Sequence, residues 1–294
     1  MACGPVRVAE TVTPRPLRCP CPGDRFETVF AYTAPPAGEV AFTFSRDRAY
    51  RRQVLRCGLC GHFVSRHEME ANALYAGPYV DATYGADGLR RAFERITALD
   101  PAKSDNVQRV RRIVDFAAVH LGGARQVPTV LDVGSGLCVF LHRMKAAGWR
   151  GTAIDPDPRA VAHARDRVGV DGVCGDFMSV EGLGQFDAVT FNKVLEHVED
   201  PVGMLARSRR HVATGGFVYI ELPDGEAAVA QGPEREEFFI DHPHVFSAAS
   251  LMLLAARAGF SVTACARLQE PSTKYTLYAF LSPDACARGE SGAP

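Results

Sequence analysis

The chain has 294 residues, of which 47% are hydrophobic and 23% are charged, and its formal net charge is −1. This composition is ordinary for a globular protein and excludes a disordered or collagen-like chain. The near-zero charge does not favour nucleic acid or a membrane surface as partner. There is no apolar run of about 18 residues, and residues 1–16 lack a signal-peptide core, so we expect a cytoplasmic protein.

Four of the nine cysteines lie in two pairs in the N-terminal part of the chain. Cys19 and Cys21 form a C-P-C pair, and Cys57 and Cys60 form a C-G-L-C pair followed by glycine. A C-x-x-C-G turn aims two thiolates at one tetrahedral ion, and two cysteine pairs joined by a β-rich insert are typical of a zinc ribbon. We therefore predict a structural Zn²⁺ on these four cysteines, in a β-rich module of residues 1–70. The alternative is a set of reduced thiols without metal.

Two details of this module stay open in the sequence. His62 or His67 could replace one cysteine at the metal, because C-P-C is tighter than the usual spacing. The insert at 27–47 alternates in places and contains a Pro-Pro-Ala-Gly turn, which is typical of a hairpin.

Residues 71–125 are predicted to bridge this module to a larger domain. The bridge carries three tyrosines, at Tyr75, Tyr79 and Tyr84. Residues 104–123 predict an amphipathic helix with Ser104 as N-cap, and we expect it to cover the sheet edge and floor a pocket. Its apolar stripe consists of Val107, Val110, Ile113, Val114 and Ala117. Its basic residues are interpreted as a solvent-facing surface: Arg109, Arg111 and Arg112.

The most informative segment is TVLDVGSGLCVFLHRM, at 129–144, which predicts a buried strand, a glycine turn and a helix. Asp132 ends the strand, and Gly134 and Gly136 allow a tight turn with room for a ligand. The following helix N-terminus points free N–H groups into the crevice where open α/β sheets bind ligands. Val139 stands where a dinucleotide site needs a third Gly or Ala, so a nicotinamide cofactor is not indicated.

Further strands follow with polar residues at their ends. Asp155 ends a strand at 152–154, about 20 residues after the glycine turn, where a carboxylate can accept hydrogen bonds from ribose hydroxyls. Asp176 ends a third strand. QFDAVTFN and GGFVYIELPD predict a fourth and a fifth strand, and GFSVTACARL with KYTLYAFLSP predicts a closing hairpin.

Four motifs in this order, DVGSG, AIDPDP, GDF and FDAVTFNKVLEHVEDP, resemble those of class I S-adenosylmethionine-dependent methyltransferases. The resemblance implies an α/β, Rossmann-like core at 126–283, with a seven-stranded, mostly parallel sheet and helices on both faces, followed by a disordered tail at 284–294. It implies that Asp155 binds the ribose, Asp176 the adenine amine, and the glycines the methionine end. Cys138 departs from the pattern, because many members have a third glycine there. The implied cofactor-binding residues are Asp132, Gly134, Gly136, Asp155, Asp176, Phe177 and Asn192.

The cysteine module, tyrosine bridge and core together resemble, more loosely, methyltransferases of sugars and bacterial polysaccharides. This implies a small hydroxylated carbohydrate acceptor, whose proton a base would remove. We predict His242 or His244 as the base and favour His244, which lies closer to a helix N-terminus and would stay neutral. His197 is interpreted as shaping the pocket wall. Ubiquinone-pathway O-methyltransferases, which resemble this stretch, use acidic residues with a divalent ion; Lys193 replaces one such carboxylate, so we predict no divalent metal there.

Two other functions are compatible with the sequence. An RNA or protein methyltransferase could use the zinc module to hold a macromolecule, and a scaffold could carry a degenerate core. The intact cofactor motifs disfavour the scaffold. The sequence leaves open the acceptor, the methylated atom (O, C or N) and the oligomeric state.

Overall fold

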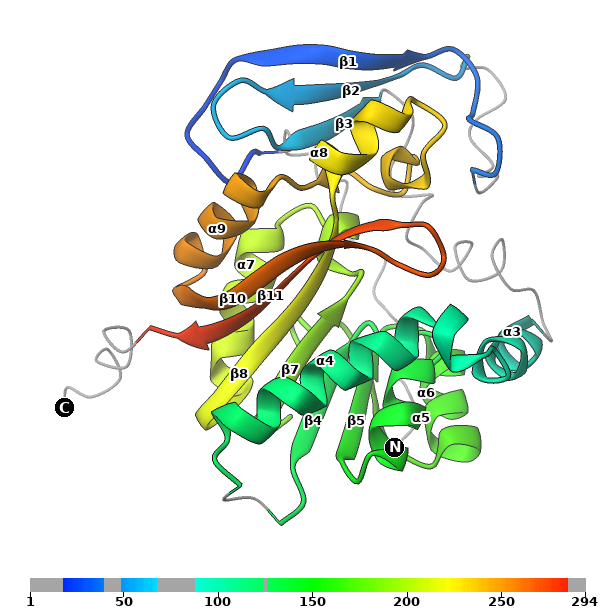
Figure 1. Cartoon of the computed structure of the whole chain (residues 1–294), viewed down its shortest axis with the longest axis vertical. Helices are drawn as coiled ribbons and strands as arrows, with labels where there is room; N and C mark the ends of the chain where they lie inside the picture. The colour runs from blue at the N-terminus through cyan, green and yellow to red at the C-terminus, as the bar shows by residue number, and fades with distance from the viewer. Residues whose placement is uncertain (1–17, 40–48, 68–87, 124–125, 285–294) are drawn as a thin grey trace.

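The structure is a computed structural model that describes residues 18–39, 49–67, 88–123 and 126–284. Two sheets form its framework (Figure 1). The smaller sheet has the order β1-β2-β3-β9, with strands β1 (Phe26–Tyr32), β2 (Arg52–Cys57), β3 (Phe63–His67) and β9 (His244–Val245). The larger sheet has the order β10-β11-β8-β7-β4-β5-β6, with strands β4 (Thr129–Val133), β5 (Arg150–Asp155), β6 (Asp171–Cys174), β7 (Phe186–Asn192), β8 (Val212–Pro223), β10 (Phe260–Gln269) and β11 (Tyr275–Pro283). The helices are α3 (Gly88–Thr97), α4 (Asp105–His120), α5 (Val139–Ala146), α6 (Pro158–His163), α7 (Pro201–Ser208), α8 (Gly225–Ala228) and α9 (Ala248–Arg257).

The larger sheet is the predicted seven-stranded, mostly parallel sheet. Strands β8, β7, β4, β5 and β6 are parallel neighbours, and β11 runs antiparallel to both β8 and β10. The fold prediction is therefore confirmed, including the closing hairpin of β10 and β11. The parallel arrangement brings the carboxyl ends of β4 to β7 to one edge, where ligands of open α/β sheets bind.

Both faces of this sheet are buried, which explains why its strands are almost continuously apolar. In β4, Val130 packs toward helices α4 and α5, whereas Leu131 and Val133 pack toward α7 and α9. Figure 1 shows α4 lying across one face of the sheet. Within the described ranges, no helix is both long and apolar enough to cross a membrane.

The smaller sheet is built from two distant parts of the chain. Its fourth strand, β9, comes from the core and pairs with β3 through Phe63 opposite Val245. The cysteine module therefore shares a sheet with residues far outside 1–70. β1 pairs with β2; the second arm of the predicted insert hairpin, the tyrosines of the bridge and nearly all of the predicted tail lie outside the described residues.

Helix α9 connects the two sheets. Ser247 caps it, as expected for a serine before an apolar helical run, and forms a capping box with Ser250. The Ser247 hydroxyl also donates to the carbonyl of Cys60, and Arg257 donates to the carbonyl of Pro20 at 2.9 Å. Both ends of α9 therefore hold the cysteine module against the core.

Candidate functional site

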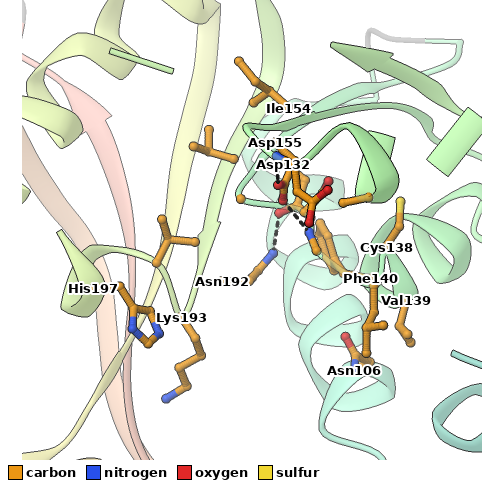
Figure 2. Close-up of a pocket in the computed structure, with 18 of the residues that line it drawn as sticks. Asn106, Asp132, Cys138, Val139, Phe140, Ile154, Asp155, Asn192, Lys193 and His197 are labelled. Carbon is orange, nitrogen blue, oxygen red and sulfur yellow. Dashed lines mark hydrogen bonds between the residues drawn. The ribbon is translucent and has the colours of Figure 1, made fainter. Parts of the chain in front are cut away.

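A cavity of about 1250 Å³ opens at the carboxyl ends of β4, β5, β6 and β7. Figure 2 shows its wall, with Asp132, Asp155 and Asn192 at the strand ends and Lys193 and His197 on the segment after β7. The cavity is where the topology of the sheet predicts a ligand site. The predicted cofactor-binding residues all line it: Asp132, Gly134, Gly136, Asp155, Asp176, Phe177 and Asn192.

The glycine turn has the backbone that its sequence predicts. Gly134 has φ +67°, and a Cβ there would lie 2.9 Å from a methyl carbon of Val194. Gly136 has φ +47°, and its N–H donates to Oδ2 of Asp155 at 2.9 Å. Cys138, where many family members have glycine, is also left-handed, with φ 58°. The departure in sequence therefore leaves the backbone conformation expected for glycine in place.

Asp132 is buried at the end of β4. Its Oδ1 accepts hydrogen bonds from Thr190 and Asn192, both at 2.7 Å. Burial raises the pKa of the Asp132 carboxyl to about 7, although these two hydrogen bonds act in the opposite direction. The Oδ1 of Asn192 and the hydroxyl of Ser135 are buried on the cavity wall without a partner among the described residues. Such atoms fit a polar ligand, because buried polar groups are normally hydrogen-bonded.

The predicted ribose and adenine residues lie next along the wall. Asp155 is 8% exposed, and its two oxygens accept the backbone N–H groups of Gly136 and Asp157, each at 2.9 Å. Each carboxylate oxygen still has a lone pair for a ligand hydroxyl. Asp176 is exposed at the end of β6, and Phe177 is buried beside it against the core. This pairing of a carboxylate with an apolar side chain fits a planar base with an exocyclic amine.

Helix α4 forms another side of the cavity through an ion-pair network that the sequence did not predict. Arg109 donates from Nε to Glu221 at 2.8 Å, and Arg112 bonds Glu221 at 2.6 Å and Glu270 at 3.1 Å. Although burial acts to raise it, the pKa of Glu221 is lowered to about 2 by the neighbouring Arg109, Lys193 and Arg112 cations. The solvent-facing interpretation holds only for Arg111, whose side chain is 76% exposed.

Two histidines meet beside the cavity. His197, on the turn after β7, lines the cavity and its Nδ1 lies 2.7 Å from the Asp241 carbonyl. His242 packs edge to face on it, with 4.7 Å between ring centroids, and its Nδ1 lies 3.0 Å from the Glu237 carbonyl. Because a carbonyl oxygen only accepts, each Nδ1 is the protonated nitrogen, and Nε2 of the neutral ring is the proton acceptor. Burial lowers the pKa of His242, which keeps it neutral.

The position of His244 corrects a prediction. His244 does not line the cavity; it lies fully buried in β9, with Nδ1 3.0 Å from Nε2 of His62. Burial lowers the pKa of His244 to about 4. The physical reason is the pairing of β9 with β3, which turns this residue toward the cysteine module. His62 bonds His244 and Ser250 and is not part of the cysteine cluster.

Glu196 adds a carboxylate to the histidine pair. It is fully buried, and neither carboxylate oxygen has a hydrogen-bond partner within the described part of the chain. One ligand atom from each of Glu196, His197 and His242 lies within 4.8 Å of the others. A carboxylate with two imidazoles is a donor set that suits a divalent transition metal. The sequence argument against a metal at Glu196 and His197 rested on Lys193 and did not foresee that His242 joins this group.

The four predicted metal cysteines form one buried cluster. Its Sγ–Sγ distances are 3.0 Å for Cys19 and Cys60, 3.3 Å for Cys19 and Cys21, and 3.5 Å for Cys21 and Cys57. All four sulfurs lie within 4.8 Å of one another and form no disulfide. Gly23 donates its N–H to the Cys21 sulfur at 3.2 Å. A tetrahedral Zn²⁺ with Zn–S of about 2.3 Å fits four sulfurs so gathered.

Comparison with known proteins identifies the family. A family model described as a methyltransferase domain matches residues 87–264, well over half of the chain. The chain belongs to this methyltransferase family, and the predicted class, an S-adenosylmethionine-dependent methyltransferase, is confirmed. The further resemblance to sugar methyltransferases gains no support from the relatives that follow.

Curated relatives match a part of the chain. The ubiquinone biosynthesis O-methyltransferase of Xanthomonas oryzae pv. oryzae is 35% identical over 144 residues, which cover 47% of this chain and 54% of the relative. The protein of the same name from Pseudomonas paraeruginosa is 34% identical over 137 residues, covering 44% and 56%. The chain spans about half the length of the curated relatives it matches.

Solved structures share the fold. The 1,6-didemethyltoxoflavin-N1-methyltransferase of Burkholderia thailandensis superposes with a TM-score of 0.54 at 20% identity, covering 82% of this chain and 99% of that one. Magnesium protoporphyrin IX methyltransferase from Synechocystis PCC 6803 gives a TM-score of 0.53 at 14% identity, covering 70% and 97%. Both were solved with bound S-adenosylhomocysteine, and at these identities the likeness concerns the fold.

Proposed function

We propose that this protein transfers the methyl group of S-adenosylmethionine to a small hydroxylated acceptor. The observation that carries the proposal is the cavity in which the glycine turn, Asp155 and Asp176 meet at the carboxyl ends of the strands. S-adenosylmethionine supplies the electrophilic methyl group, so the main task of the protein is to position the two reactants. The near-neutral charge of the chain supports a small acceptor over nucleic acid.

We assign the cofactor to the predicted residues. Asp155 would accept hydrogen bonds from the ribose, Asp176 and Phe177 would hold the adenine, and Gly134 with Gly136 would leave room for the methionine end. The spare lone pairs of Asp155 and the two positive φ angles support this assignment. Asp132, together with Asn192 and its unpartnered Oδ1, offers polar contacts on the same wall.

The size of the cavity supports a second ligand. Its volume of about 1250 Å³ exceeds the roughly 300–1,000 Å³ that is usual for a pocket holding one small molecule. We therefore propose that the acceptor binds beside the cofactor. The looser sequence resemblance is the basis for proposing a sugar or nucleotide-linked sugar in secondary-metabolite or polysaccharide biosynthesis as this acceptor. The O-methyltransferase relatives favour oxygen as the methylated atom.

We propose His197 as the general base, with His242 orienting it. His197 is the histidine of this pair that lines the cavity, and its Nδ1 contact with the Asp241 carbonyl leaves Nε2 as proton acceptor. His242 packs against its ring and fixes its orientation. This assignment replaces His244, which lies in the smaller sheet.

A panel assay with labelled S-adenosylmethionine tests the function. The panel contains nucleotide sugars, free glycans, catechols and total RNA. We expect incorporation into a small hydroxylated compound, and a turnover about 10²–10⁴-fold lower in His197→Gln with unchanged affinity for S-adenosylhomocysteine. His120→Gln, outside the cavity, is the matched control and should keep full turnover. Incorporation into RNA alone would support the macromolecular alternative.

A divalent cation is a second candidate for this corner of the site. The unpartnered carboxylate of Glu196 favours it, since a metal ion would satisfy both oxygens. Against it, Lys193 already places a positive charge near Glu196. Dialysis against a chelator, followed by assay with and without Mg²⁺ or Mn²⁺, separates the two. Metal-dependent turnover would make His197 a ligand and not a base.

We propose that the cysteine cluster binds one structural Zn²⁺ per chain. Burial raises the pKa of the Cys60 thiol to about 11, so zinc binding would displace a proton there. The link from the cluster to α9 supports a structural role, because the metal would fix the module against the core.

A further inference from the structure

The lysines of this chain are few and unevenly placed. The sequence has 29 arginines and only four lysines. Three of the four, Lys103, Lys193 and Lys274, line the cavity. The fourth, Lys145, bonds two backbone carbonyls and does not line it. A lysine presents a compact charge on a slender stem, so it can enter a cavity as a point contact for an anion.

Lys193 is the deepest of these cations. It follows β7 with φ 61°, an uncommon backbone for a residue other than glycine, and such outliers cluster at functional sites. Its Nζ donates to the Thr276 hydroxyl at 2.7 Å. Within the part of the chain that the structure describes, Lys193 forms no ion pair. An ammonium has three donors, so two remain for a ligand.

Other cations of the cavity wall have carboxylate partners. Arg109 is paired with Glu221, Arg159 with Asp157, and Lys274 with Glu236 at 3.1 Å. Lys103 is exposed at the rim. Lys193 therefore differs from the paired residues in offering uncommitted donors inside the cavity.

The three lysines converge from distant segments. Ser272, in the turn between β10 and β11, bonds Asp105 through its N–H at 3.0 Å and its hydroxyl at 2.6 Å, which brings Lys274 and Lys103 to the same rim. Burial lowers the pKa of Lys193, and the Arg109 and Lys274 cations lower it further, although Glu221 and Glu196 oppose them. An anion beside Lys193 would stabilise its charged form.

We propose that Lys193, with Lys274 and Lys103 at the rim, binds an anionic oxygen group of the methyl acceptor, a carboxylate or a phosphate. Figure 2 shows Lys193 and His197 side by side on one wall, across the cavity from Phe140. An acceptor anchored there would present a neighbouring hydroxyl to His197. This inference rests on the proposed methyltransferase function and names the substrate class.

Lysine NMR on the full chain tests the inference, since only four side chains contribute signals. The protein is labelled with ¹³Cε-lysine and saturated with S-adenosylhomocysteine and zinc, and Lys193→Met assigns the resonance. Inorganic phosphate and benzoate are titrated separately at constant ionic strength. We expect a saturable shift of Lys193, smaller shifts of Lys274 and Lys103, and none of Lys145. A response to phosphate alone or to benzoate alone identifies the group.

Affinity measurements on variants complete the test. Lys193→Met should weaken binding of the effective anion about 10- to 100-fold, the loss expected for a charged hydrogen bond, and keep its affinity for S-adenosylhomocysteine. Lys145→Met should change neither the affinity for the anion nor the affinity for S-adenosylhomocysteine. Equal, unsaturable shifts of all four lysines would overturn the inference. If the wild-type protein does not bind S-adenosylhomocysteine, the proposed function fails first, and the assignment of the anion to a methyl acceptor fails with it.

Discussion

Arg109 donates its Nε to the carboxylate of Glu221 at 2.8 Å and thereby ties helix α4 to strand β8 of the larger sheet. The Glu221 side chain is fully buried, and that of Arg109 is 10% exposed. Because α4 contributes one wall of the cavity, this pair holds the wall in place. The order of the site therefore depends on an interaction between residues 112 positions apart in the sequence.

The first prediction concerns this pair. Glu221→Gln leaves the buried Arg109 without its carboxylate, while Arg112 keeps Glu270, and should lower the free energy of unfolding by about 3–5 kcal/mol at pH 7. The pKa of Glu221 is lowered to about 2 in the folded protein, so the ionised carboxylate stabilises the fold fully above pH 4.5, the ordinary pKa of glutamate. This stabilisation is lost as the pH falls from 4.5 through 2. The difference in free energy of unfolding between wild type and variant should therefore be smaller at pH 3 than at pH 7, as measured by urea unfolding.

Glu94→Gln is the matched control, because Glu94 pairs with Arg90 and Arg167 on the surface, with its side chain 48% exposed. Its cost should stay below about 1 kcal/mol. Similar costs for the two variants would contradict a special role for the buried network.

The second prediction concerns the glycine turn. Gly134→Ala combines backbone strain of roughly 1–2 kcal/mol with a contact to Val194, whose methyl would lie 2.9 Å from the new Cβ. We expect more than about tenfold weaker binding of S-adenosylhomocysteine, since the turn must shift. Gly148→Ala is the control: Gly148 has φ +86°, but no atom lies near the position that its Cβ would take. This variant should lose stability and keep its affinity for S-adenosylhomocysteine. If the double variant Gly134→Ala with Val194→Ala recovers part of the affinity, the contact with Val194 causes the loss. If it recovers no affinity, the contact is not the cause.

The third prediction concerns the metal. Elemental analysis should find about one zinc per chain, as four tetrahedral thiolate ligands imply. Cys57→Ser, or a strong chelator, should release it and lower the melting temperature, because a structural site contributes folding energy. Cys265→Ser changes an exposed thiol and should keep both zinc and melting temperature. A zinc-free wild type with an unchanged melting curve rules out a structural metal.

The fourth prediction concerns pH. Burial raises the pKa of Asp132 to about 7, so the protonated form stabilises the fold at low pH and this stabilisation is lost as the pH rises through 7. Asp132→Asn keeps a neutral side chain that still accepts from Thr190 and Asn192. The free energy of unfolding of the variant, relative to that of the wild type, should rise by on the order of 2–3 kcal/mol between pH 5 and pH 8. Denaturant unfolding of both proteins at pH 5 and pH 8 measures this change. If the difference in free energy of unfolding between the two proteins is the same at both pH values, the pKa of Asp132 is not raised.

The core of the fold followed from local patterns in the sequence, whereas parts of the site did not. Apolar strands ending in Asp132, Asp155 and Asp176 predicted the parallel sheet and its ligand edge, since each signal is contained in a short segment. His244 was misplaced because the pairing of β9 with β3 joins segments about 180 residues apart, a contact that no local pattern encodes.

The arginines of α4 were misread for a related reason. Arg109 and Arg112 are three residues apart and border the apolar stripe, which places them on the sheet side of the helix. That spacing was a usable signal. Their partner Glu221 lies in an otherwise apolar strand, and a buried glutamate there requires a cation from elsewhere in the chain.

The most direct test of the central claim is calorimetric titration of the zinc-loaded protein with S-adenosylhomocysteine, comparing wild type with Asp155→Asn. We predict that the wild type binds one equivalent and that the variant binds about 10- to 100-fold more weakly, because it loses charge-assisted hydrogen bonds to the ribose. Asp166→Asn, an exposed carboxylate outside the cavity, should bind like the wild type. Absence of binding to the wild type, or equal affinities of wild type and Asp155→Asn, would contradict the account.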